Sequence, residues 1–73
     1  MRRYKGHMNG ERYLADRNIT EVHDLDNERK ECQIDIIINY GFEKPYESLN
    51  QAYWDGFRRC KHCIKNTNKP DSV

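Results

Sequence analysis

The sequence has few of the features that let a short chain fold unaided. It holds 73 residues, of which 36% are hydrophobic, and only three are cysteines. A core built from so few apolar side chains is marginal, and natural chains of this size add disulfides, a structural metal or oligomerisation. Three cysteines cannot all pair within one chain. A bound metal is therefore the first candidate for the missing stability.

Long apolar runs are also absent. The basic start Met1-Arg2-Arg3-Tyr4-Lys5-Gly6 leads into no hydrophobic stretch, so we expect no secretory signal, no membrane contact and a cytoplasmic location. The charges nearly balance, with 13 Lys+Arg against 12 Asp+Glu, which gives no overall attraction for polyanions. No activated nucleophile, pair of carboxylates or phosphate loop is evident, so we expect no enzymatic activity.

Polar residues of mixed charge occupy both ends of the chain. They predict flexible tails over residues 1–10 and 65–73, and one folded domain over residues 11–64. Within the domain, Arg12–Ala15 and Ile19–Val22 contain residues typical of strands and flank the turn sequence Asp-Arg-Asn. This arrangement predicts a hairpin, followed by a polar loop.

Two further segments have helical signals. In the isoleucine-rich segment 32–40, Ile34, Ile37 and Ile38 have helical spacing before Gly41, although isoleucine also favours strands. Ser48-Leu49-Asn50-Gln51 fits a capping box, and Gly56 can end the helix that it starts. The expected fold is a small α+β zinc-stabilised domain, with a short β-hairpin or small antiparallel sheet, two short helices and a Cys-x2-Cys knuckle.

The residues that carry chemistry follow the pattern His23-x8-Cys32-x27-Cys60-x2-Cys63. Two residues between Cys60 and Cys63 let both sulfurs reach one cation, while nearby N–H groups point at the first thiolate. Cys32 and His23 complete a Cys3His set, which is typical of closed structural zinc (Zn2+) sites without a position for catalytic water. Iron is also compatible with this sulfur-rich donor set.

Each ligand has a competing interpretation. A redox Cys-x-x-Cys is expected at the start of a helix, whereas here a predicted helix ends just before the pair. Cys32 can also serve as a small buried hydrophobe. His23 has three substitutes in the sequence, which are His7, Asp24 and His62. The side chain of His62 is expected to point away from the metal.

A family resemblance is carried by the segment Ala52-x3-Gly56-Phe57-Arg58-x-Cys60-Lys61-x-Cys63. It resembles the metal-binding domain of the Ada DNA-repair protein, over roughly residues 12–64. The segment from Tyr13 to Asp35 also resembles a group of short bacterial proteins of unassigned function, and this resemblance implies His23 as the first ligand. The resemblance implies that the chain shares the fold of this domain and binds a metal ion.

The sequence departs from Ada at the position that does the repair chemistry. The family's first ligand is a cysteine that accepts a methyl group from a damaged DNA phosphate, whereas Glu28 stands here at the corresponding spacing. An imidazole at His23 is not a methyl-accepting thiolate. We therefore do not expect methyl-phosphotriester repair.

Three classes of function are left. The first is a protein-interaction module that binds an unknown protein partner or forms a homodimer, with Tyr46, Trp54 and the face of residues 34–38 as exposed candidates. The second is weak nucleic-acid binding by the basic rim of the knuckle, without an evident aromatic platform. A thiol-redox or metal-sensing role is the third. The residues of the basic rim are Arg58, Arg59, Lys61 and Lys65.

Overall fold

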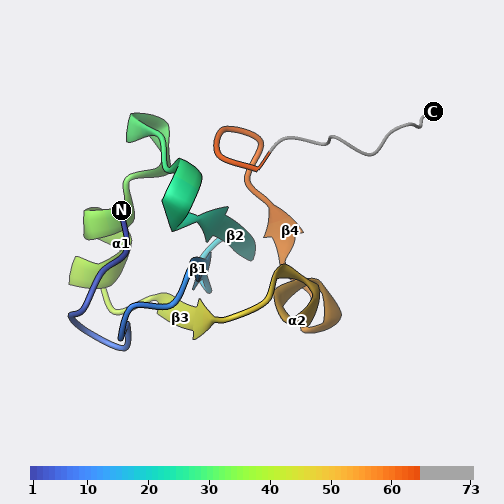
Figure 1. Cartoon of the computed structure of the whole chain (residues 1–73), viewed down its shortest axis with the longest axis horizontal. Helices are drawn as coiled ribbons and strands as arrows, with labels where there is room; N and C mark the ends of the chain where they lie inside the picture. Colours follow the sequence, from blue (N-terminus) through green and yellow to red (C-terminus); the bar gives the residue numbers. More distant parts are fainter. Residues whose placement is uncertain (65–73) are drawn as a thin grey trace.

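The computed structural model describes residues 1–64 and places a four-stranded sheet at the centre of the domain (Figure 1). The strand order is β3-β1-β2-β4. The strands are β1 (Tyr13–Asp16), β2 (Glu21–Asp24), β3 (Glu43–Tyr46) and β4 (Arg58–Arg59). This confirms the α+β class, but the sheet is mixed, because β4 runs parallel to β2. The alternative of a small antiparallel sheet is therefore wrong at this edge.

The predicted hairpin is confirmed, with its strands shifted along the chain. β1 and β2 pair antiparallel from Tyr13 opposite Asp24 to Asp16 opposite Glu21. In the turn, the Asp16 carboxylate accepts a hydrogen bond of 2.9 Å from the backbone N–H of Asn18, as is typical of Asx turns. The second strand extends beyond the predicted end at Val22, so His23 lies within β2.

Both predicted helices are present. α1 (Ile34–Asn39) buries Ile34, Ile37 and Ile38, which settles the choice between helix and strand. Gly41 follows it with a φ of 78°, a conformation that favours glycine. α2 (Leu49–Trp54) begins at Ser48, whose hydroxyl accepts a hydrogen bond of 3.3 Å from the Gln51 amide. The polar loop before α1 contains two short 3-10 helices, η1 (Leu25–Asn27) and η2 (Lys30–Cys32).

Strands β3 and β4 were not expected from the sequence. β3 pairs antiparallel with β1 and carries Tyr46 into the core, where its ring packs edge-on against Phe57 at 5.8 Å between centroids. The phenol also donates a hydrogen bond to Asp55. The expectation that Tyr46 is exposed is therefore wrong. The isoleucines of the expected exposed face of residues 34–38 are also mostly buried, and among the apolar candidates only Trp54 and Ile36 are exposed.

The segment 1–10 packs against the domain, in place of the predicted flexible tail. Met8 belongs to the core, and the Arg3 guanidinium forms ion pairs with Glu28 at 2.7 Å and Asp35 at 2.9 Å. The backbone N–H of His7 donates to the buried Glu43 carboxylate at 2.7 Å. These contacts join residues far apart in the sequence. The predicted tail over residues 65–73 lies outside the described residues.

No helix formed by the described residues is long and apolar enough to cross a membrane.

We expect Met8→Ala to destabilise the protein by about 2 to 5 kcal/mol, because it removes a buried side chain and leaves a cavity. Met8 is 3% exposed, whereas Met1 is 80% exposed and provides the matched control. Urea unfolding of both variants measures the difference. Equal stability of M8A and M1A would show that the N-terminal segment contributes nothing to the core.

Candidate metal centre

The four side chains of the predicted ligand set meet at one buried point. Their donor atoms all lie within 4.8 Å of one another. His23 comes from β2, Cys32 ends η2, and Cys60 and Cys63 lie in the turn after β4. The parallel pairing of β4 with β2 brings the knuckle beside His23. The cluster can therefore hold a metal ion.

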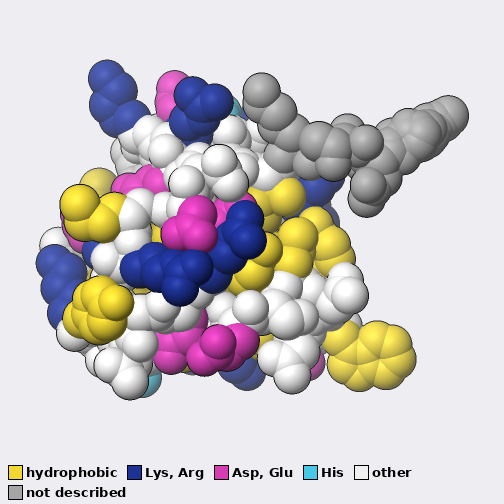
Figure 2. All heavy atoms as spheres, viewed as in Figure 1, with side chains coloured by type: hydrophobic (Ala, Val, Ile, Leu, Met, Phe, Trp, Pro, Cys, Tyr) yellow, Lys and Arg dark blue, Asp and Glu magenta, His cyan; other side chains and the backbone are white. Residues whose placement is uncertain are grey.

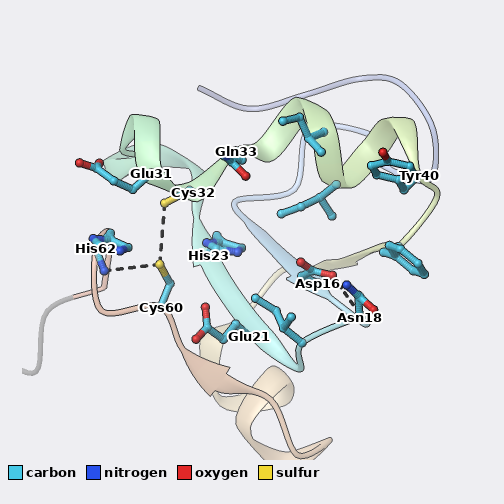
Figure 3. A pocket seen from close by; sticks show the side chains of 14 residues that line it. Asp16, Asn18, Glu21, His23, Glu31, Cys32, Gln33, Tyr40, Cys60 and His62 are labelled. Atoms are coloured by element: carbon cyan, nitrogen blue, oxygen red, sulfur yellow. Dashed lines mark hydrogen bonds between the residues drawn. The ribbon is translucent and has the colours of Figure 1, made fainter.

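Two of the distances between donor atoms match those around a tetrahedral ion. The sulfurs of Cys32 and Cys60 lie 3.8 Å apart (Figure 3), and Cys63 Sγ lies 3.8 Å from Nδ1 of His23. Two sulfurs bound to one zinc at about 2.3 Å lie about 3.8 Å apart in tetrahedral geometry. A disulfide requires about 2.05 Å between sulfurs, and all three cysteines are free.

The alternation of β2 aims His23 at the cluster. His23 lies opposite Leu14 in the hairpin register, so both side chains leave the same face of the sheet. Nδ1 faces Cys63, and Nε2 is buried without a hydrogen-bond partner among the described residues. Burial lowers the pKa of the imidazole, although the charges of Glu21 and Asp16 oppose this shift. A neutral imidazole is the form that binds metal.

Backbone N–H groups point at two of the sulfurs. The amide of His62 lies 3.4 Å from Cys60 Sγ, and the amide of Asp24 lies 3.2 Å from Cys63 Sγ. The contact between the His62 amide and Cys60 Sγ is the one that the knuckle sequence predicts. Such an N–H group stabilises negative charge on the thiolate. Without a metal, burial raises the pKa of the Cys32 and Cys63 thiols. Metal binding must therefore displace thiol protons, which links it to pH.

The alternative donors are engaged elsewhere. Asp24 accepts two hydrogen bonds of 3.0 Å from the Arg12 guanidinium, and these help hold its pKa below the usual range against the effect of burial. His7 Nδ1 lies 3.2 Å from the Glu43 carboxylate. Glu28, at the position of the family's first cysteine, accepts from Arg3. His62 is exposed and lies outside the donor cluster.

Two residues of the predicted basic rim, Arg58 and Arg59, line a groove of about 950 Å³, which we call the basic groove. Lys61 is exposed but does not line it, and Lys65 lies outside the described residues. The groove also contains two arginines and three aromatic side chains that the sequence reasoning did not associate with the knuckle, namely Arg12, Arg29, Tyr13, Tyr53 and Phe57. An aromatic surface is thus present where none was expected. These residues come from the hairpin, the polar loop, α2 and the segment around β4, so only the folded chain brings them together.

The chain matches no protein-family model, no curated protein and no solved structure.

We expect the purified protein to carry one zinc per chain, because four matched donors surround one point. Native mass spectrometry measures the added mass. Cys60→Ser should abolish zinc retention, because a hydroxyl is a poor replacement for a thiolate ligand.

His62→Ala is the matched control for that substitution. It changes the same turn outside the donor cluster and should retain the zinc. A polypeptide mass without added metal, or loss of zinc in H62A but not in C60S, would contradict the assignment.

Proposed function

We propose that the chain is a small zinc-stabilised protein-interaction module without catalytic activity. The convergence of His23, Cys32, Cys60 and Cys63 at one buried point carries this proposal. Four protein ligands fill a tetrahedral shell, and closed shells of this kind are typical of structural zinc sites. The role of the metal would then be to hold segments together.

The location of the ligands supports a structural role. They join β2, the end of η2 and the turn after β4. Structural zinc contributes roughly 10–16 kcal/mol of apparent binding energy in small peptides. This is comparable to the whole stability of a typical domain, about 5–15 kcal/mol. A bound zinc would therefore dominate the stability of this chain.

Exposed apolar side chains support the interaction role. Trp54 is 90% exposed and Tyr40 is 73% exposed. Figure 2 shows hydrophobic side chains reaching the surface at several places on one face. Tryptophan and tyrosine are enriched among the residues that dominate binding energy at interfaces. A protein partner or a second copy of the chain is the proposed partner, in the reducing cytoplasm, where zinc thiolates persist.

The proposal does not include methyl transfer, despite the resemblance to the Ada metal-binding domain. Glu28, at the spacing of the methyl-accepting cysteine, lies in an ion pair with Arg3 and not in the donor cluster. His23 fills the first ligand position instead. Exposure to methylated DNA should accordingly leave the protein mass unchanged.

Removal of the metal should unfold the protein cooperatively. A strong chelator is expected to collapse the dispersion of the amide NMR spectrum, and added zinc should restore it. Acid should have the same effect as the pH falls below about 6.5, the ordinary pKa of histidine. The lowered pKa of His23 means that the unfolded state takes up the proton first, so stability is lost as pH falls. A chelated protein with a native-like spectrum would contradict a structural role.

Nucleic-acid binding is the second candidate, and the composition of the groove favours it. Arg12 is paired with Asp24, but Arg29, Arg58 and Arg59 form no ion pair among residues 1–64. Tyr13, Tyr53 and Phe57 lie in the same groove. Cationic side chains beside aromatic rings match the backbone and the bases of a single strand.

The salt dependence of binding tests this candidate. For a labelled single-stranded oligonucleotide, three phosphate contacts predict that the logarithm of the binding constant falls with the logarithm of the salt concentration with a slope of about −2. Arg58→Gln should reduce the magnitude of the slope, whereas Lys5→Gln, on the N-terminal segment, should leave it unchanged. Equal effects of the two variants would indicate unspecific charge attraction and would remove the groove as a binding site.

A further inference from the structure

A pocket of about 520 Å³ adjoins the candidate metal centre. Three of the four donor residues, His23, Cys32 and Cys60, line it (Figure 3). The basic groove, in contrast, touches only Cys63 of the four. The donor cluster therefore borders two surfaces, which share His62. The proposed function does not yet name a ligand for the pocket.

The charges around this pocket are of one sign. Three carboxylates line it, from Asp16, Glu21 and Glu31, and no lysine or arginine does. None of the three forms an ion pair among residues 1–64. A divalent ion held by three thiolates and a neutral imidazole adds one further net negative charge. The pocket is thus suited to a cation.

Asp16 leaves one carboxylate oxygen free at this pocket. The residue is 7% exposed, and within the described residues Oδ1 accepts a hydrogen bond from the Asn18 amide. Oδ2 forms no ion pair or hydrogen bond there, and it does not belong to the buried atoms that lack a partner. A cation that enters the pocket can therefore pair with this oxygen.

His23 provides a second, independent indication of a ligand. Its ring lines the pocket, its side chain is 3% exposed, and Nε2 lacks a hydrogen-bond partner among residues 1–64. With Nδ1 turned to the sulfurs, Nε2 carries the proton and requires an acceptor. Metal-binding histidines almost always donate this second N–H to a carboxylate, a carbonyl or water. A ligand that brings both a cation and a carbonyl would satisfy Asp16 and His23 together.

The remaining wall of the pocket is apolar. Ile19 and Ile36 line it and are each 47% exposed, and Tyr40 and Phe42 lie at the same wall. Such a surface suits an aliphatic stem, because lysine and arginine bury their methylene groups along apolar side chains while the charged end stays polar.

We propose that this pocket binds a lysine or arginine side chain of a protein partner. The cation would face Asp16 and Glu21, the methylene stem would lie along Ile19 and Ile36, and the peptide backbone would supply carbonyl acceptors. A simple amine lacks these carbonyl groups, so a peptide fits the pocket better. The inference rests on the proposed function, since it names the class of partner for the interaction module.

The test uses NMR titration of the zinc-loaded full chain with the blocked peptide acetyl-Ala-Lys-Ala-amide. We expect shifts in the amides of pocket residues, and at least tenfold weaker binding of the same peptide with norleucine in place of lysine. Asp16→Asn and Glu21→Gln should each weaken binding severalfold. Asp16→Asn retains an oxygen that can accept from the Asn18 amide, so the turn is preserved.

Glu47→Gln is the matched control, because Glu47 is exposed and lies outside the pocket. It should bind the lysine peptide as the parent protein does. Equal binding of the lysine and norleucine peptides would overturn the proposal, as would the absence of shifts, or shifts confined to residues of the basic groove. Native mass spectrometry of the same sample separates the two proposals: a zinc-loaded chain without lysine-dependent binding refutes only the pocket, whereas a metal-free folded chain refutes the structural zinc.

Discussion

The candidate metal centre depends on one geometric requirement, namely that four donor atoms from distant parts of the chain meet at one point. The strand register determines whether they do. Successive residues of β2 face opposite sides of the sheet, so a slip of one residue would replace His23 at the cluster with Val22 or Asp24. The pairing of Val22 with Arg59 has a similar role, because it fixes where the chain enters the knuckle at Cys60. The sheet thus positions the donor set, and few apolar residues are needed to do so.

Local signals in the sequence predicted local features of the structure well. The capping hydroxyl of Ser48, the left-handed glycine at Gly41 and the helical spacing of the isoleucines each act within a few residues. The four donors were also predicted, because their residue types and spacing leave few other arrangements. The structure shows them close together and able to hold a metal, while the identity of that metal stays a prediction.

Features that depend on contacts between distant residues were missed. β3 has the sequence Glu-Lys-Pro-Tyr, which has no alternating apolar pattern, and it forms because β1 offers it an edge. The N-terminal segment contains one buried apolar side chain, Met8, and is otherwise held by charges such as Arg3. The prediction of the basic rim was likewise incomplete, because Arg29 is about thirty residues from Arg58 in the sequence.

The order of the ligands along the chain also determines how the domain can assemble. Cys60 and Cys63 are separated by two residues, so they form a local chelate even in an unfolded chain. Joining this half to Cys32 closes a loop of 27 intervening residues, at an entropic cost of about 3 kcal/mol that a pre-bound ion helps to offset. The same closure brings β4 beside β2. For a chain whose local pair already holds an ion, the remaining closure is intramolecular, so we expect its rate to be independent of the metal concentration.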